Sequence, residues 1–569
     1  MERPLFPVAS PQNVPLADKQ DLKELTEETV KLVSTYNEIP VGGVTSGPTI
    51  KVNNTTSLLA FIYEKVRNAV EYRDDHLLRR AAIERILRRR FSQKNLPLKI
   101  SLPLLRELIR ARYLKNDTVP ETKVTEVGLI IAKYQRLFEE LEHLQSRPEA
   151  AKLSEWFLQI LSAEIEGALV SDREREALVE VMYRFFDRNL QEKGQVSEEN
   201  RRLQLYLATQ RALLKSDDAL LRFRLLEFYY PEWSGIFPSF EPEGELPMWE
   251  VGSLAKVKTL AESASRLMTT VEEQLNDSAG LRLHYFLKKH TAPFLILRDV
   301  IEENPGSARE RFKEPMRLEE TVRRICRKRY EEAKAKVSRM VVRAIIYIFL
   351  TKMVFGLILE APADIFIYKK VSMYPLLINA LFPPLLMFLI ATTIKVPGEE
   401  NTRIILLKIR SILFNEPYFQ EGDRALTFAW QPPVRGSFLL NSFRVIYLLA
   451  FAITFGTIIG ILNFLLHFNP VSITIFLFFL CVVALFGYAI RRSASELSTV
   501  GRGENLISPL IDFFFLPILR VGRWLSMEIS RLNFLGYFFD FIIEAPLKSF
   551  IEIAEEWLSF VKEKKEELT

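Results

Sequence analysis

The sequence predicts an all-α protein with a multi-helix cytoplasmic domain, which a long basic helix joins to a four-span transmembrane region with interfacial C-terminal helices. Three observations predict this fold class. Apolar residues concentrate after residue 340, in four stretches of about the 20 residues that a bilayer-spanning helix needs. Before residue 340, apolar residues recur at three- and four-residue steps, which is the spacing of amphipathic helices. Lys and Arg concentrate where these two parts of the chain meet.

The first 230 residues predict a mostly disordered arm followed by a helical cytoplasmic subdomain. Residues 1–56 are rich in Pro, Gly, Val, Thr and Asn, with only a brief helical pattern near residues 21–33. Residues 57–230 have helical periodicity almost throughout, so we expect six or seven helices and no strand there.

Residues 231–249 form a predicted Pro/aromatic linker, because they contain four prolines and no apolar period. One interpretation is a connecting loop that packs Trp233, Phe237 and Phe240 against the helices. The alternative is a docking segment for a partner. Helical periodicity resumes in residues 250–340, the second cytoplasmic segment.

The second cytoplasmic segment ends in a basic juxtamembrane helix. Neither Gly nor Pro occurs between Leu318 and Phe355, so one continuous helix is predicted to enter the bilayer. Residues 321–343 contain nine Lys or Arg and two acids, although the whole chain has a net charge of only +5. We expect anionic lipid headgroups to bind this helix. The residues expected to bind them are Arg323, Arg324, Arg327, Lys328 and Arg329.

Four transmembrane spans are predicted. They cover about residues 341–359, 374–394, 445–466 and 471–490. The strongly basic flanks all fall on one side, which predicts a multi-pass protein of the cell (inner or plasma) membrane with both termini cytoplasmic. No apolar segment near Met1 resembles a signal peptide. The amphipathic tail, residues 491–569, is expected to lie in the headgroup region or to pack on the cytoplasmic ends of the spans.

Ionisable and polar residues inside the predicted spans are the candidates for a functional site. An ammonium in mid-span costs about 2.5–3.5 kcal/mol on insertion scales, so Lys352 needs an explanation. One interpretation is a polar path between spans, with Asn379 or Asn463 as the candidate neighbour. A second is that Lys352 extends to the cytoplasmic interface, where its charge is hydrated. A third is a buried ion pair with Glu360 or Asp364.

Two further patterns have more than one interpretation. Gly456 and Gly460 form a small-xxx-small pattern, which suits close helix packing either within the chain or between two copies. Six arginines between residues 79 and 90 lie on one predicted helix. They suit a solvated face, contact with anionic lipid, or contact with RNA.

Signatures of catalysis and of metal or cofactor binding are absent from the sequence. It contains no GxxxxGK[ST], GxSxG, HExxH or CxxC motif. Its two cysteines, Cys326 and Cys481, are far apart and unlike in their surroundings, so a disulfide framework is not expected. No base-stacking aromatic motif supports nucleic-acid binding. We therefore expect no catalytic residue, no cofactor and no metal.

The end of the chain is similar to a family of uncharacterised polytopic membrane proteins of bacteria. The similar segments are 522–526 (GRWLS), 542–546 (IIEAP) and 555–557 (EEW), with a weaker likeness at 105–108 (LREL) and 111–114 (ARYL). The resemblance implies no known activity and transfers no functional residue.

Three functions remain open. The first is a membrane-anchored scaffold or assembly factor, because a large helical domain accompanies four spans without a catalytic signature. The second is a transporter or channel component, because Lys352, Asn379 and Pro383-Pro384 lie in the spans. The third is an interfacial enzyme acting on lipid, which only the amphipathic tail supports. A protein partner of the cytoplasmic domain is expected, and the oligomeric state is open.

Overall fold

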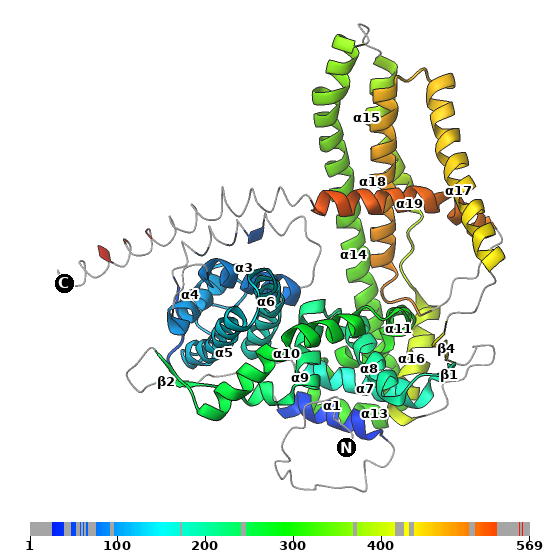
Figure 1. Cartoon of the computed structure of the whole chain (residues 1–569). Helices are drawn as coiled ribbons and strands as arrows, with labels where there is room; N and C mark the ends of the chain where they lie inside the picture. The colour runs from blue at the N-terminus through cyan, green and yellow to red at the C-terminus, as the bar shows by residue number, and fades with distance from the viewer. Residues whose placement is uncertain are drawn as a thin grey trace. The chain divides into compact units, whose positions relative to one another are not determined.

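The computed structural model divides the chain into two compact units (Figure 1). The first unit comprises Met1–Lys288, Glu421–Trp430 and Leu535–Thr569, and the second comprises Lys289–Gln420 and Gln431–Phe534. The structure describes residues 25–38, 47–52, 57, 61, 64–65, 75–91, 96–170, 173–240, 246–367, 373–415, 426–431, 437–499, 507–531, 553, 557, 560 and 561.

The first unit is an array of helices that pack side by side. Its helices are α1 (Glu27–Glu38), α3 (Asp75–Phe91), α4 (Pro97–Arg110), α5 (Thr122–Leu144), α6 (Arg147–Leu169), α7 (Arg173–Asn189), α8 (Glu198–Thr209), α9 (Asp218–Tyr229), α10 (Val251–Leu275) and α11 (Ser278–Lys288), with a π turn η1 (Gln210–Leu214) and a 3-10 turn η2 (Pro231–Gly235). Helix α5 packs on α4, α6 and α10, and α6 packs on α3 and α9. The all-α fold class predicted from periodicity is confirmed.

Two short ladders interrupt the helices. Strand β1 (Gln191–Lys193) pairs in parallel with β4 (Thr427–Ala429), and β2 (Ser239–Phe240) pairs antiparallel with β3 (Pro247–Met248). The expectation that no strand would occur here was wrong for these segments. Segments of two or three residues are too short to establish a period-two pattern, so sequence periodicity does not reveal them.

Two segments of the predicted N-terminal arm pack on the first unit. Helix α1 contacts α7 and buries Leu32 and Val33 completely. Further along, Ile50 is buried, and its backbone N–H donates to the carbonyl of Val119 at 2.9 Å. Helix α1 overlaps the brief helical pattern expected near residues 21–33, and the segment 47–52 packs through Ile50 beside the loop before α5.

The six arginines of α3 form ion pairs. Their partners lie on α3 itself (Glu84) and on other elements: Arg79 pairs with Glu166, Arg80 with Glu84 and Asp217, Arg85 with Glu64, Arg88 with Glu84 and Glu155, and both Arg89 and Arg90 with Glu107. Contact with anionic lipid or with RNA would require free guanidinium groups, whereas a partly solvated face is compatible with these pairs. Except for Glu84, the acids come from other parts of the chain, so the cluster appears more basic when α3 is read by itself.

The Pro/aromatic linker buries Trp233 and Ile236 and exposes other residues. Trp233 is fully buried, as predicted, and its ring lies 4.6 Å from the ammonium of Lys133. That ammonium also pairs with Glu164 at 2.5 Å. Phe237, by contrast, is 43% exposed. Trp233 therefore fixes the linker to α5 and α6.

The second unit contains the membrane region and several shorter helices. Its elements are α12 (Ala292–Glu303), η3 (Pro305–Ser307), α13 (Ala308–Lys313), α14 (Pro315–Phe355), the π turns η4 (Gly356–Glu360) and η5 (Ala363–Ile367), α15 (Met373–Thr392), α16 (Glu399–Phe414), α17 (Ser437–Gly460), the π turn η6 (Ile461–Leu465), α18 (Pro470–Ala494) and α19 (Ile507–Arg531). The predicted continuous helix is confirmed as α14, which has 41 residues.

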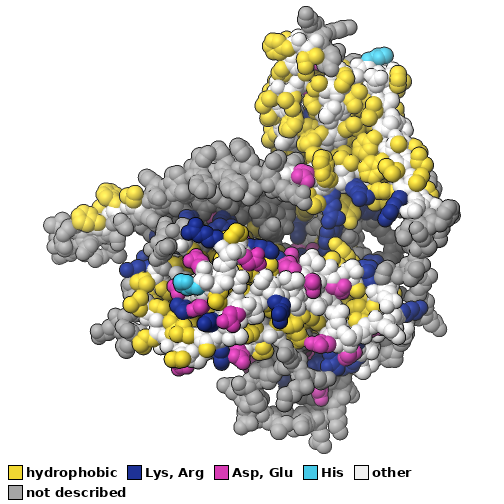
Figure 2. All heavy atoms as spheres, in the orientation of Figure 1, with side chains coloured by type: hydrophobic (Ala, Val, Ile, Leu, Met, Phe, Trp, Pro, Cys, Tyr) yellow, Lys and Arg dark blue, Asp and Glu magenta, His cyan; other side chains and the backbone are white. Residues whose placement is uncertain are grey.

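Four helices of this unit are long and apolar enough to cross a membrane, in agreement with the four predicted spans. They cover Pro315–Ile367, Pro375–Thr392, Asn441–Leu465 and Pro470–Ala494. Hydrophobic side chains cover their surface in Figure 2, and Lys and Arg gather at one end of it. Pro383-Pro384 does not break α15, which continues through both prolines.

The spans pack unequally. Helices α14, α15 and α18 contact one another, whereas α17 packs mainly on α19 and its own π turn. Figure 1 shows α19 lying across α18. The crossing depends on Gly522, where an added Cβ would lie 2.5 Å from the backbone oxygen of Cys481. The amphipathic segment that contains α19 therefore packs on spans, whereas residues 532–552 lie outside the described part of the chain.

A candidate intramembrane polar site

An ion pair lies buried between the spans. Lys352 near the end of α14 and Glu360 at the end of η4 are 2% and 1% exposed, and Lys352 Nζ donates to Glu360 Oε2 at 3.2 Å. The ammonium also lies 5.2 Å from the centre of the Phe479 ring on α18. The interpretation that Lys352 reaches the hydrated interface was wrong, because its charge is neutralised inside the bundle.

The π turn brings the two charges onto one side of the helix. In an ideal α-helix, residues eight apart point about 80° away from each other, at about 100° per residue. The π turn η4 accommodates about one extra residue, so Lys352 and Glu360 align as residues seven apart would, within about 20°. Pro362 lies two residues after Glu360. Because proline has no backbone N–H, it cannot donate to the carbonyl of Ile358, which explains why the α-helical hydrogen-bond pattern is replaced by a wider turn here.

Two other spans complete the coordination of the Glu360 carboxylate. Asn379 Nδ2 on α15 donates to Glu360 Oε1 at 2.6 Å, and Ser472 Oγ on α18 donates to the same oxygen at 2.7 Å. Asn379 Nδ2 also donates to the carbonyl of Ser472 at 3.2 Å. These four residues, Lys352, Glu360, Asn379 and Ser472, are hereafter the polar network. Because it joins α14, α15 and α18, it fixes how these spans meet.

A second carboxylate lies one helical turn beyond Glu360. Asp364 is 2% exposed and accepts a 2.7 Å hydrogen bond from Asn469 Nδ2. Asn469 is the N-cap of α18, and its Oδ1 accepts from the backbone N–H of Ser472 at 2.8 Å. The cap of α18 therefore connects Asp364 to the polar network.

An apolar core borders the network on the side of the basic flanks. This core consists of the buried residues Ile348, Met387, Ile475, Phe479, Val483 and Ile490. Charges enclosed in this way interact strongly, because little water screens them. The arrangement can hold α14, α15 and α18 in one register.

The structure brings together most of the predicted intramembrane residues. Lys352, Glu360 and Asn379 meet in the polar network, and Asp364 lies beside it. Asn463 is exposed on η6 and is no neighbour of Lys352. The sequence Glu-Ala-Pro occurs at 360–362 and again at 544–546. The second occurrence lies outside the described residues.

Sequence reasoning missed two members of the site, Ser472 and Asn469. A signal for both was present in Asn469-Pro470-Val471-Ser472, which places an N-cap and a polar third residue at the start of the fourth span. The sequence does not show that this cap faces the first span, because that depends on how α18 is rotated against α14.

The predicted small-residue contact has no counterpart among the described residues. A Cβ added to Gly456 or Gly460 would meet no atom within 4 Å among them. Packing within the chain and contact between two copies therefore both stay predictions. The close helix contact is made by Gly487 instead, where a Cβ would lie 2.6 Å from Ile390 Cγ2.

The five juxtamembrane basic residues are mostly engaged by acids. Their recorded pairs are Arg323 with Glu319 and Glu399, Arg324 with Glu303, Arg327 with Glu399, and Arg329 with Asp299 and Glu332. Arg329 lies 12 residues before Val341, about 18 Å along the helix. The exposed Lys336 and Arg339 lie closer to the apolar span, and they are better placed to bind headgroups.

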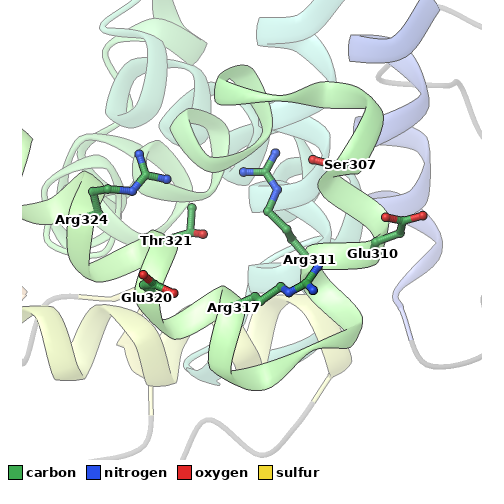
Figure 3. A pocket seen from close by; sticks show the side chains of 7 residues that line it. All are labelled: Ser307, Glu310, Arg311, Arg317, Glu320, Thr321 and Arg324. Atoms are coloured by element: carbon green, nitrogen blue, oxygen red, sulfur yellow. The ribbon is translucent and has the colours of Figure 1, made fainter.

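A pocket of about 370 Å³ opens beside the start of α14 (Figure 3). It is lined by Ser307, Glu310, Arg311, Arg317, Glu320, Thr321 and Arg324. Although three guanidinium groups suggest an anion site, Arg324 is bound to Glu303, and Arg311 donates to Glu303 and to the carbonyl of Asn304. Glu310 and Glu320 add negative charge, so the pocket has little net attraction for an anion.

Metal-binding clusters are absent from the described part of the chain, where no three His, Cys, Asp or Glu side chains could hold an ion together. Both cysteines are free and buried. Comparisons with protein-family models, with curated proteins and with solved structures find no match for this chain. The polar network and the composition of the first unit are therefore the basis for proposing a function.

Proposed function

We propose that this protein is a membrane-anchored scaffold or assembly factor, with the helical first unit as its interaction domain. The observation that carries the proposal is the segment Leu426–Trp430. In sequence it lies between α16 and α17, and thus between two spans, yet it forms strand β4 of the first unit. The helical unit thus includes a segment that lies between two spans in the sequence, as expected for an interaction domain that is anchored to the membrane.

The β4 segment is bound by backbone and side-chain contacts together. Gln191 N–H donates to the Leu426 carbonyl at 2.7 Å, and Trp430 N–H donates to the Lys193 carbonyl at 2.9 Å. Trp430 is 4% exposed, and its Nε1 donates to Glu192 Oε2 at 2.9 Å. An edge strand that takes up an extended segment is a common mode of peptide recognition.

An exposed apolar patch on the first unit supports an interaction role. Phe237, Leu246, Met248 and Val251 flank the β2–β3 ladder and are 43%, 59%, 44% and 85% exposed. Apolar side chains grouped in this way on a soluble surface are typical of contact sites. The patch supports the interpretation of the linker as a docking segment for a protein partner.

The proposed location is the cell (inner or plasma) membrane, with the first unit and both termini in the cytoplasm. The basic residues that flank the spans support this orientation. Anionic lipid headgroups are the proposed lipid partner of the basic end of α14, through exposed side chains such as Lys336 and Arg339.

Site-specific photo-crosslinking of the full-length chain in its native membrane tests the scaffold function. A photoreactive amino acid replaces Met248 or Val251 in the exposed patch. A matched control places it at Glu262, which is exposed on α10 outside the patch. We expect the same cross-linked protein from both patch positions and none from the control. Absence of any product at both patch positions, with the chain correctly inserted, would contradict the proposal.

A second candidate function is a transporter or channel component, and the polar network favours it. Ionisable groups buried between spans are expensive and commonly mark pathways for ions or protons. Reconstitution of the chain in liposomes, with a pH indicator inside, would detect proton flux driven by a pH step. Flux that Glu360→Gln abolishes would support this candidate, and equal leakage with and without the protein would exclude proton transport. An interfacial enzyme acting on lipid stays a prediction that none of these contacts favours.

A further inference from the structure

We propose that helices α17 and α19 together form a binding site for the headgroup of an anionic phospholipid, at the end of the spans where the basic flanks lie. The site, hereafter the headgroup site, consists of Arg444 and Tyr447 on α17 and of Arg520 and Arg523 on α19. It requires the proposed orientation of the spans, but it does not require the scaffold function. It is separate from the lipid contact proposed for the basic end of α14.

Arg520 connects the two helices of the headgroup site. Helix α19 packs on α17 and α18, and the Arg520 guanidinium lies 5.4 Å from the centre of the Tyr447 ring on α17. The electrons of an aromatic face attract a cation, so this contact restricts where the guanidinium can point. Helical side chains lean toward the N-terminus of their helix, so the Tyr447 ring covers the preceding turn, which carries Arg444. Arg444 and Arg520 therefore reach the same part of the surface.

The headgroup site combines three positive charges. Helix α17 contains no acid, and Arg444 is its single charged residue. Arg520 and Arg523 are three residues apart and thus neighbours on α19, whereas Asp512 and Glu528 do not have the three- or four-residue spacing to either of them. All three arginines are exposed, and none forms an ion pair with a residue that the structure describes. Neighbouring like charges repel one another, and one anion shared among them offsets this repulsion.

The headgroup site lies at the depth of lipid headgroups. Arg444 is about 30 Å along the helix from Leu465, the end of the third span, and the hydrocarbon layer is about as thick. Trp524, which is 59% exposed beside Arg523, belongs to the residue types that are enriched at this boundary. One turn deeper than Arg444, Leu448 and Leu449 are 69% and 55% exposed. This apolar surface suits acyl chains, so a whole lipid fits better than a free phosphate.

The chemistry of the site favours an anionic lipid over a zwitterionic one. Guanidinium groups bind phosphate through two parallel hydrogen bonds, as their planar shape allows. Phosphatidylglycerol presents a phosphate without a cation, whereas the choline of phosphatidylcholine brings a positive charge that three arginines repel. We therefore expect selectivity for phosphatidylglycerol.

Native mass spectrometry of the full-length chain, released from micelles that contain phosphatidylglycerol or phosphatidylcholine, tests the headgroup site. We expect phosphatidylglycerol to be retained in preference. The double variant Arg520→Gln with Arg523→Gln should weaken the binding of one phosphatidylglycerol about tenfold, because charge-assisted hydrogen bonds to its phosphate are lost.

The matched control is Arg491→Gln with Arg492→Gln. These exposed arginines end α18 on the same side of the membrane but do not belong to the site. The control removes the same charge and should bind phosphatidylglycerol as the unsubstituted chain does. Equal weakening in both double variants would show a general attraction between basic flanks and anionic lipid, and would overturn the proposal.

Variants of Tyr447 test the site without changing its charge. Tyr447→Leu removes the ring that orients Arg520 and should weaken the same lipid, whereas Tyr447→Phe keeps the ring and should not. Where Tyr447→Leu does not fold, the arginine variants decide, because their side chains are exposed.

Glycerol phosphate, added without lipid, tests a soluble source of the same anion. Binding as tight as that of phosphatidylglycerol would overturn the assignment to a lipid. The photo-crosslinking from Met248 and Val251 involves no residue of the headgroup site. Loss of lipid selectivity would therefore leave the scaffold function in place, and absence of a cross-linked partner would leave the lipid site in place.

Discussion

At the scale of single residues, both units of the chain contain a buried charge that is paired. Lys133 in the first unit and Lys352 in the second are both buried beside a glutamate and an aromatic ring. For Lys133, burial lowers the pKa of the ammonium, and Glu164 opposes that shift. Such pairs add little net stability when complete, but the loss of one partner leaves the other charge uncompensated.

Lys352→Met is expected to destabilise the membrane region, because Glu360 would lose its counter-charge. Removal of one member of a buried pair costs about 3–5 kcal/mol. The double variant Lys352→Met with Glu360→Gln should recover part of this loss, because Asn379 and Ser472 can still bond a neutral amide. Thermal unfolding in detergent measures both variants. A single variant as stable as the unsubstituted chain would mean that the pair is not formed.

His290 is expected to make the chain less stable in mild acid. Burial, with help from Lys408 and Lys289, lowers the pKa of its imidazole from 6.5 to about 3. Between these values the unfolded chain takes up a proton that the folded chain refuses, so stability falls as the pH decreases from about 6.5 toward 3. The effect approaches a tenfold change in the unfolding equilibrium constant per pH unit.

The variant His290→Gln isolates this contribution. Unfolding measured at pH 5 and pH 7.5 should show a smaller loss of stability in the variant than in the unsubstituted chain. Equal losses would show that His290 stays hydrated in the folded state.

At the scale of secondary structure elements, π turns and glycines determine where the spans touch. The π turn η4 aligns Lys352 with Glu360, and Gly522 lets α19 cross α18 at Cys481. In contrast, the face of α17 that carries Gly456 is open. Substitution by alanine is therefore expected to have opposite effects at Gly522 and at Gly456.

Gly522→Ala is expected to weaken the packing of α19, because the added methyl group would lie 2.5 Å from a backbone oxygen that cannot move aside. Overpacking of this kind costs about 1–3 kcal/mol. Gly456→Ala is the matched control, since its methyl group meets no atom of the described residues and alanine favours the helix by about 1 kcal/mol. The melting temperature should fall for the first variant and hold or rise for the second. A fall for Gly456→Ala together with loss of a dimer in detergent would instead reveal contact between two copies.

At the scale of the whole molecule, the chain alternates between the helical unit and the membrane unit. The segment 421–430 returns to the first unit between two stretches of the second. The division between the units therefore falls at Lys288, whereas the sequence-based division into cytoplasmic segment and spans at residue 340 stays a prediction. A fragment that ends at residue 340 would lack β4 and would split α14.

Membrane topology is tested by cysteine labelling in a background without Cys326 and Cys481. Both native cysteines are buried, so their replacement by alanine or serine removes no exposed thiol. We expect His467→Cys, in the exposed turn before α18, to react with an impermeant reagent added to intact cells. Lys328→Cys, on α14 before the first span, should react only after permeabilisation. The reverse pattern would invert the proposed orientation.

The sequence by itself determined the fold class, the four spans and the continuous helix α14. These follow from apolar periodicity, length, and the absence of Gly and Pro between Leu318 and Phe355, all of which act locally. The sequence also singled out Lys352, Glu360, Asp364 and Asn379, because polar groups inside a span are costly wherever the helix points.

Only the tertiary structure decided which of these groups meet and which charges are neutralised. Whether Lys352 reaches water or Glu360 depends on a π turn and on the rotation of α18. Pro362 marks where the helix can widen but not which charges then align, and the rotation of α18 leaves no local pattern in the sequence. The arginines of α3 likewise appeared free until the acids of α4 and α6 packed beside them. Local propensity fixes the elements, whereas pairing between distant residues is fixed by the packing of one helix against another.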